Sequence, residues 1–217
     1  MLLAGKVAVI FGGSGAIGSA VAHAMAREGA HVYLGARSQE KLDWAASSIR
    51  TAGGAAETFV TDVLDEYGTS KQVTQLAQQT GGIDVVVNAT GFMHEQGKRI
   101  EALSLSEFMS GITPFLSAQF NIAKAVTPHM GGNRAGVILT VVAPAAPMAM
   151  PGHLGHIVGC AGTEPLLKRL PANWGRRIFG SSACARMRLW MPFRPVPIPG
   201  RFLPLKRSQW VLPSHNG

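Results

Sequence analysis

The sequence predicts an α/β protein whose core is a doubly wound parallel sheet with strand order 3-2-1-4-5. Short apolar runs alternate with amphipathic helical patterns as far as about residue 142, which is typical of repeated βαβ units. A glycine-rich turn follows the first apolar run, where such a sheet binds phosphate groups. The 217 residues are 47% hydrophobic and 15% charged, which suits one domain with a sizeable core.

The predicted elements follow one another in the order that this sheet requires. The first run, KVAVIF at residues 6–11, is almost entirely apolar, as expected of a central strand that is buried on both faces. The other predicted strands are residues 31–35, 56–60, 84–88 and 136–142, and helical patterns cover about 18–28, 40–53 and 104–130. Right-handed crossovers between the parallel strands give the order 3-2-1-4-5.

The sequence carries no signal for a membrane or for secretion. No apolar run reaches the roughly 18 residues of a membrane span, and no charged start with an apolar stretch and a cleavage site opens the chain. Cys160 and Cys184 are the only cysteines and make no disulfide framework. We therefore expect a cytoplasmic protein.

The glycine-rich turn is FGGSGAIG, residues 11–18, between the first predicted strand and the first helix. Glycines let the backbone approach a pyrophosphate, and the free N–H groups of a helix N-terminus favour an anion. A glycine cluster alone also fits a simple tight turn, but the strand before it and the helix after it favour a dinucleotide. The candidate binding residues here are Gly12, Ser14, Gly15, Ile17 and Gly18.

The turn and its surroundings resemble the short-chain dehydrogenase/reductase family over residues 1 to about 162. The family's loop is TGxxxGIG, and Gly12, Ile17 and Gly18 match it. Two positions depart from the pattern, because Phe11 replaces the threonine and Ala16 replaces the middle glycine. The resemblance implies a Rossmann-like fold and hydride transfer to or from a carbonyl or alcohol substrate, and it allows a homo-oligomer.

Two further motifs support the resemblance. Asp62 and Val63 match the family's acidic dipeptide that contacts adenine, and NATG at 88–91 resembles its NNAG stretch beside the adenine ribose. The resemblance therefore adds Asp62, Val63, Asn88, Ala89 and Gly91 to the candidate cofactor residues.

The choice of cofactor depends on GARS, residues 35–38, after the second predicted strand. An acidic residue there would bind a ribose 2′-hydroxyl, whereas an arginine accommodates a 2′-phosphate. The chain offers Arg37 and Ser38 and no carboxylate, and a guanidinium pairs well with phosphate. An isolated arginine is often only a solvated charge, but the place of Arg37 favours NADP(H) over NAD(H).

The resemblance also implies a catalytic set that the chain does not contain. In the family a tyrosine transfers the alcohol proton, a lysine four residues later lowers its pKa, a serine orients the carbonyl and an asparagine completes a proton relay. Here Thr113 occupies the position of the asparagine, and Ala143, between Val142 and Pro144, occupies that of the serine. His156 and Cys160 occupy the positions of the tyrosine and the lysine. We assign no standard catalytic residue, and His156 is the remaining candidate.

Two other interpretations of His156 compete with a catalytic role. An imidazole titrates near pH 6.5 and can transfer protons, but the Cys160 thiol cannot supply the lysine's fixed charge, so a structural role for both residues is the competing interpretation. His153, His156 and Cys160 would share one helical face and could suit zinc. Three ligands without a fourth argue against that site, and we expect no metal.

Residues 163–217 differ in composition from the part before them. They carry ten Lys/Arg against Glu164 alone, whereas residues 1–162 carry ten against eleven acidic residues. They also hold 8 of the 13 prolines and 3 of the 4 tryptophans. We expect a dinucleotide-binding domain over 1–162 and an irregular tail over 163–217, without a sixth strand, which leaves residues 136–142 as an apolar edge.

Codon arithmetic offers an explanation for the tail. Asn173-Trp174-Gly175 must be encoded AAY-TGG-GGN, and joining each third nucleotide to the first two of the next codon then forces Leu-Gly. With allowed codons around it, the same DNA can encode GELGPQNIRVV, which resembles the family's ELGPxGIRV segment. A frameshift near residues 162–165 is our hypothesis, and the nucleotide sequence of codons 155–180 tests it.

Three classes of function follow from these features. The first is an NADP(H)-dependent oxidoreductase with an unidentified carbonyl or alcohol substrate, and the second is a cofactor-binding protein that catalyses nothing. The third is a nucleic-acid binder, because the tail has basic residues for phosphates and tryptophans for stacking on bases. The tail lacks a recognition module, and a frameshift predicts the same composition. We therefore expect a dinucleotide as partner, and neither nucleic acid nor a membrane.

Overall fold

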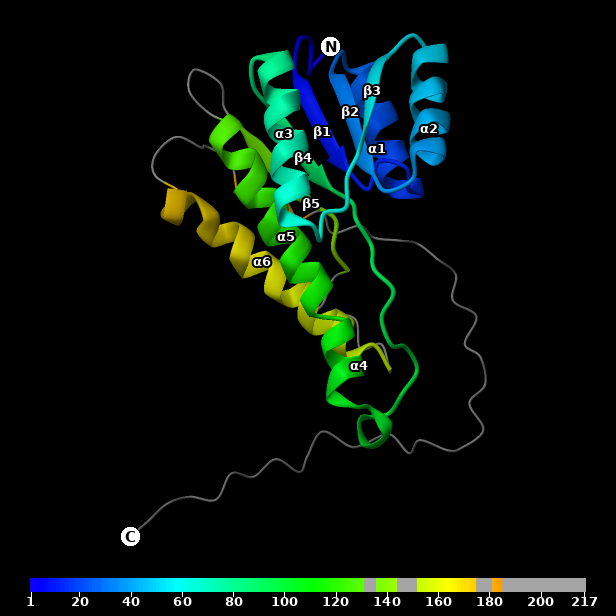
Figure 1. The fold of residues 1–217 in the computed structure, drawn as a ribbon, viewed down its shortest axis with the longest axis vertical. Helices are drawn as coiled ribbons and strands as arrows, with labels where there is room; N and C mark the ends of the chain where they lie inside the picture. The colour runs from blue at the N-terminus through cyan, green and yellow to red at the C-terminus, as the bar shows by residue number, and fades with distance from the viewer. Residues whose placement is uncertain (131–135, 144–151, 175–180, 185–217) are drawn as a thin grey trace, which may run out of the picture. The chain divides into compact units, whose positions relative to one another are not determined.

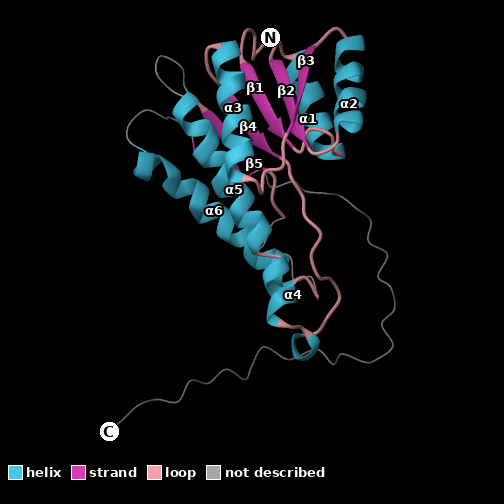
Figure 2. Ribbon diagram, viewed as in Figure 1, coloured by secondary structure: helices cyan, strands magenta, loops and turns pink. Residues whose placement is uncertain are grey.

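A parallel β-sheet flanked by helices organises the chain in the computed structural model, which describes residues 1–130, 136–143, 152–174 and 181–184 (Figures 1 and 2). The strands are β1 (Val7–Phe11), β2 (His31–Ala36), β3 (Ala55–Val60), β4 (Val85–Asn88), β5 (Val137–Thr140) and β6 (Ser181–Cys184). Their order in the sheet is β3-β2-β1-β4-β5-β6, and each neighbouring pair is parallel. The predicted order 3-2-1-4-5 is confirmed.

The helices connect these strands and cover both faces of the sheet. They are α1 (Ala16–Arg27), α2 (Gln39–Thr51), α3 (Glu66–Thr80), α4 (Leu105–Ser110), α5 (Thr113–Val126) and α6 (Leu154–Trp174), with 3-10 turns η1 (Ile100–Ala102) and η2 (Thr127–His129). Within the described part of the chain, no helix has the length and apolar character that crossing a bilayer requires.

Strand β1 shows why a central strand is apolar at every position. Val7, Val9 and Phe11 face one core cluster, which α3, α5 and α6 cover. Ala8 and Ile10 face a second cluster, which α1 and α2 cover. Side chains alternate between the two faces of a strand, so each face of β1 needs its own apolar residues.

Helix α3 was not among the predicted helices. Its N-terminus is capped by Asp65, whose side chain accepts a hydrogen bond of 3.0 Å from the Gly68 N–H, and Gly81 ends it with a φ of 73°. The residues that α3 buries are Thr69, Val73, Leu76 and Ala77. Their helical spacing between an aspartate cap and a glycine stop is the signal that could have found it.

The described residues beyond 162 correct the expectation of an irregular tail. Helix α6 continues across that boundary to Trp174, and β6 pairs with β5 through Ile138 and Ser181 and through Thr140 and Cys184, with an irregular register between them. The expected absence of a sixth strand and the expected edge at β5 are therefore wrong. Residues 175–180 and 185–217 lie outside the described part, and the frameshift stays a hypothesis.

Apolar packing explains why residues 163–174 form helix in spite of their composition. Thr163 and Leu167 are buried, and Leu170 packs against the same core as α3 and α5. Glu164 and Lys168 form an ion pair one turn apart on the exposed side. Counting prolines and charges missed this spacing of buried residues, which is what places a helix on a core.

The α6 packing can be tested by shortening Leu167, whose side chain is 5% exposed. Leu167→Ala should lower the free energy of unfolding by about 2–4 kcal/mol, because it leaves a cavity in the core. Val158→Ala on the same helix is the control, since Val158 is 42% exposed, and it should change stability by about 0.5 kcal/mol or less. Urea titration measures both. Equal, small effects would mean that residues 163–174 do not pack on the core.

Candidate functional site

A hollow lies at the carboxyl ends of β1, β2, β3 and β4, where parallel α/β sheets bind their ligands. Nine of the predicted cofactor residues line it, namely Gly12, Ser14, Gly15, Arg37, Ser38, Asp62, Val63, Ala89 and Gly91. It is also lined by residues that the sequence analysis did not assign, which are Gly35, Ala36, Lys41, Thr61, Thr90 and Phe92. Their roles toward a cofactor remain predictions, but their convergence from four strand ends makes one continuous surface.

The glycine-rich loop forms the floor of this hollow because its backbone lies directly on the neighbouring strand end. Gly12 has a φ of 77°, and a Cβ there would lie 2.6 Å from the Ala89 carbonyl oxygen. The Gly12 N–H donates to the Gly35 carbonyl at 2.8 Å, and the Gly15 N–H donates to Gly12 at 3.0 Å. A side chain at Gly12 would fill this close contact, so the loop has the bare backbone that a pyrophosphate cradle requires.

Three predicted cofactor residues do not line the hollow. Gly18 is buried beneath the loop, where a Cβ would lie 2.2 Å from the Gly12 carbonyl oxygen. Ile17 lies on α1 and is 38% exposed. Asn88 is buried, and its Oδ1 accepts hydrogen bonds from the Thr90 N–H at 3.1 Å and the Thr90 hydroxyl at 2.6 Å. Gly18 and Asn88 thus support the shape of the site from below.

The rim beside β2 concentrates positive charge. Arg37 is exposed, Lys41 lines the hollow one helical turn further on, and both flank Ser38. Ser38 caps α2, and its hydroxyl accepts a hydrogen bond of 3.4 Å from the Lys41 N–H. Among the described lining residues, Asp62 is the only acid, and it comes from the β3 side. An anion at this rim would meet two cations and a helix N-terminus.

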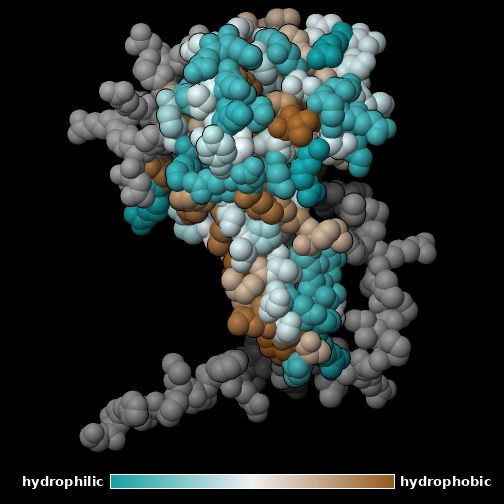
Figure 3. Space-filling view, viewed as in Figure 1, coloured by the Kyte–Doolittle hydropathy of each residue, from teal (hydrophilic) through white to brown (hydrophobic). Residues whose placement is uncertain are grey.

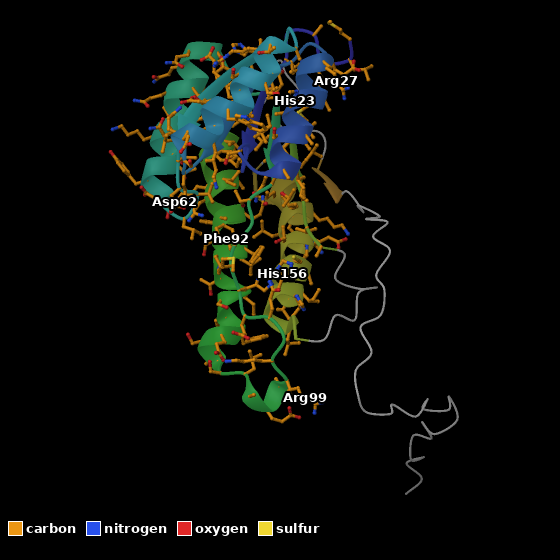
Figure 4. The ribbon with its side chains drawn as sticks, turned by 90° about the vertical axis from the view of Figure 1, so that its right-hand side faces the viewer. His23, Arg27, Asp62, Phe92, Arg99 and His156 are labelled. Atoms are coloured by element: carbon orange, nitrogen blue, oxygen red, sulfur yellow. The ribbon has the colours of Figure 1, made fainter. Side chains whose placement is uncertain are left out.

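Beyond Phe92 the contacts are made by aromatic and imidazole rings, whereas backbone and cationic side chains line the hollow. The Phe92 ring meets Phe115 edge-on at 5.2 Å, and Phe115 lies 4.8 Å from the His156 ring. His94 stacks on His156 with centroids 4.3 Å apart, and His153 lies 6.0 Å from His94. Figure 4 shows Asp62 near the sheet, then Phe92, and then His156 on α6. We call His94, His153 and His156 the imidazole cluster.

Glycines place His156 in this cluster. A Cβ on Gly159 would lie 2.4 Å from the Gly111 carbonyl oxygen, and one on Gly155 would lie 2.2 Å from the Phe108 carbonyl oxygen. Because these positions have no side chains, α6 can press its backbone against the junction of α4 and α5. His156, between the two glycines in sequence, is thereby brought against Phe115.

The surroundings of His156 favour its uncharged form. Figure 3 shows apolar side chains at the surface near α4, and the exposed apolar residues there include Leu105 and Met109, with Leu154 and Val158 on α6. Burial lowers the pKa of His156 below its usual 6.5, and repulsion from His94 and His153 lowers it further. His156 is therefore neutral at pH 7, which suits a proton acceptor better than a donor.

The positions that correspond to the family's catalytic residues do not form a catalytic set. Thr113 is exposed at the start of α5, and Ala143 offers no hydroxyl. The buried thiol of Cys160 lies 3.6–3.8 Å from the ring nitrogens of His156. A thiol beside a neutral imidazole gives no fixed positive charge, so neither Cys160 nor His156 plays the part of a lysine.

The imidazole cluster does not have the geometry of a metal site. Among the described residues, no three His, Cys, Asp or Glu side chains converge on a common point. The stacked rings of His94 and His156 face each other, with an interplanar angle of 13°. Ring nitrogens that coordinate one ion must instead point toward it.

Comparison with known proteins gives the family of this chain and the same fold. The family model described as short chain dehydrogenase matches residues 6–162. Gluconate 5-dehydrogenase from Gluconobacter oxydans is 29% identical over 174 residues, which are 80% of this chain and 67% of that protein. 2,3-Dihydro-2,3-dihydroxybenzoate dehydrogenase from Bacillus subtilis is 33% identical over 142 residues, which are 65% of this chain and 54% of that protein.

A solved structure of similar fold contains a dinucleotide. It is a putative NAD(P)-dependent gluconate 5-dehydrogenase from Beutenbergia cavernae with bound NADP at low occupancy. The alignment has a TM-score of 0.69 and 28% identity, and it covers 79% of this chain and 68% of that one.

Proposed function

Because this chain belongs to the short-chain dehydrogenase/reductase family, we propose that it binds NADP(H) in the hollow at the carboxyl ends of β1–β4 and prefers it to NAD(H). The observation that carries the preference is the rim of Arg37, Ser38 and Lys41, where no carboxylate from β2 competes for the ribose. The NADP in the Beutenbergia structure supports this proposal by analogy. Lys41 adds a second cation that can reach the same 2′-phosphate.

The remaining lining residues would each contact a different part of the dinucleotide. The bare backbone at Gly12 and Gly15 and the N-terminus of α1 would hold the pyrophosphate. Asp62 and Val63 would lie beside the adenine, and Ala89 and Gly91 beside its ribose, as the family motifs imply. Phe92, at the end of the hollow nearest the imidazole cluster, would then border the nicotinamide.

The chemistry that a bound nicotinamide supplies is hydride transfer to or from a carbonyl or alcohol carbon. The residues of this chain would have to orient the substrate oxygen and exchange its proton. Thr113, Ala143 and Cys160 supply none of the usual groups, and neutral His156 is the remaining candidate for the proton. We therefore propose very slow turnover at most, and cofactor binding without catalysis is the second candidate function.

The cofactor preference is tested by titrating the folded protein with NADPH and with NADH. A charge-assisted contact contributes about 1.5–3 kcal/mol, so NADPH should bind about tenfold or more tightly than NADH. Arg37→Glu should reverse that order, because a carboxylate repels the 2′-phosphate and can accept from a 2′-hydroxyl. Lys41→Glu should reduce the preference by a smaller factor. Fluorescence of the reduced nicotinamide reports all six affinities.

The matched control is Arg27→Glu, which makes the same change of charge on α1. Arg27 is exposed in the last turn of that helix, and Figure 4 shows it far from Asp62. It should leave the ratio of the two affinities unchanged. Equal affinities of the wild-type protein for the two dinucleotides would contradict the proposed preference.

A further inference from the structure

The imidazole cluster connects the segment after β4 with the start of α6 through the stacked rings of His94 and His156. His94 follows β4 in the segment that lines the hollow, and His156 and His153 belong to the first turns of α6 and the residues before it. The His94 and His156 rings stack at 4.3 Å, and His153 meets His94 at 6.0 Å. Two imidazolium ions at such a separation repel each other strongly, because each is partly removed from water.

Two hydrogen bonds fix the orientation of the His94 ring. Its Nδ1 lies 3.0 Å from the Phe92 carbonyl oxygen, which can only accept, so Nδ1 carries the proton. Its Nε2 lies 3.3 Å from the Gln96 side-chain nitrogen, which donates to it. Protonation of Nε2 would set two donors against each other until the exposed Gln96 amide turns. These contacts hold the His94 ring between the Phe92 backbone and the Gln96 side chain.

We propose that the stacked His94–His156 pair, with His153 beside it, is a proton-sensitive clasp that keeps residues 89–94 in the shape required for dinucleotide binding and opens when a second imidazole is protonated. This inference rests on the proposed dinucleotide site. One proton can be accommodated, since an imidazolium can stack on a neutral ring. A second proton adds a like charge against the same face, and the rings must separate.

The charged side chains of the described segments around the cluster are largely engaged with one another. The segments packed against it carry Glu95 and Lys98 beyond His94, Glu107 on α4 and Cys160 on α6. Glu107 binds Lys98 and accepts from Ser104, which holds its pKa at about 2. The hydrogen bond to Glu107 raises the pKa of Lys98, and the charge of Glu95 adds to that effect. Helix α5 contributes the uncharged ring of Phe115.

The coupling to the hollow runs through Phe92. Its carbonyl oxygen is bound to His94, and Phe92 itself lines the hollow together with Ala89, Thr90 and Gly91. When His94 leaves His156, the backbone of Phe92 loses its tether to α6. We therefore expect a weaker dinucleotide site at acidic pH, with the proton uptake linked to release of the cofactor.

The test is calorimetric titration with NADP⁺ at pH 7.5 and pH 5.5, on the wild-type protein and on His156→Phe. Phenylalanine keeps a stacking ring at this position but cannot take up a proton. The affinity of the wild-type protein should fall about tenfold more than that of the variant, which corresponds to about one unit of pKa difference between free and bound forms. NAD⁺, which lacks the titrating 2′-phosphate, should give the same difference between the two proteins.

His23→Phe is the matched control, because His23 lies on α1 away from the cluster (Figure 4), and it should behave as wild type. Equal pH dependence of the wild type and His156→Phe would overturn the clasp while leaving the cofactor site intact. A folded wild-type protein that binds neither dinucleotide at pH 7.5 would overturn the proposed function and the clasp together.

Stability gives a second measurement if His156→Phe binds poorly for another reason. The pKa of His156 is lowered in the folded state, so as the pH falls below about 6.5 the unfolded chain takes up its proton first. Folding stability should therefore fall between pH 7 and pH 5. This fall should be smaller in His156→Phe and in His94→Phe than in wild type, and an unchanged fall in both variants would contradict the clasp.

Discussion

Replacing Gly18 with valine is expected to abolish NADPH binding while the parallel sheet stays folded. Gly18 lies under the glycine-rich loop, where even a Cβ would lie 2.2 Å from the Gly12 carbonyl oxygen and 2.8 Å from its carbon. These are backbone atoms, so the loop itself must move to admit a side chain. Overpacking of this kind costs about 1–3 kcal/mol, which is smaller than the stability of most domains. A displaced loop, however, no longer presents its N–H groups to a pyrophosphate.

The expected measurement is a loss of at least about hundredfold in NADPH affinity, with a far-ultraviolet circular dichroism spectrum like that of wild type. Ala24→Val is the matched control on the same helix. Ala24 lies on α1, is exposed and does not line the hollow. It should bind NADPH like wild type. Normal binding by Gly18→Val would place the dinucleotide elsewhere.

The strand order could be predicted from the sequence because each buried strand is a continuous apolar run that is separated from the next by a helical pattern. β1 and β4 show this most clearly, since all their residues are buried. Helix α3 was not predicted because Thr69 interrupts its apolar stripe, whereas the buried residues of the predicted helix α2 are all apolar. The C-terminal half of α6 was missed because prolines and positive charges outweighed Leu167 and Leu170 in the composition.

Some residues of the candidate site could likewise be predicted from the sequence, and others could not. Residues that belong to short local patterns, such as Gly12, Arg37 and Asp62, could be named from the sequence and do line the hollow. Lys41 belongs to no motif and lies at the rim because α2 begins at Gln39, directly after its cap Ser38. His94 could not be connected with His156, because their contact depends on how closely α6 crosses Gly111. Contacts between distant segments require the packed fold.

The last expected result concerns catalysis, where the effect on rate is largest. With NADPH and simple ketones or aldehydes, the protein should show no reduction above background. Proton transfer by a positioned acid contributes typically about 10²- to 10⁴-fold, and the described site has no phenol and no ammonium beside His156. The pKa of His156 is lowered by burial and by His94 and His153, so at pH 7 it has no acidic proton to give to a developing alkoxide.

The rate of NADPH oxidation, followed by its absorbance in the presence of each carbonyl compound, measures this expectation. The comparison should include His156→Ala and, as the control away from the site, His23→Ala. If turnover is found and disappears only in His156→Ala, His156 is the proton-transfer residue, and its rate of carbonyl reduction should rise as the pH falls toward its lowered pKa. If robust turnover survives His156→Ala, the reacting carbonyl lies against residues other than the imidazole cluster. Binding of NADPH without any turnover is the outcome that the replaced residues Thr113, Ala143 and Cys160 lead us to expect.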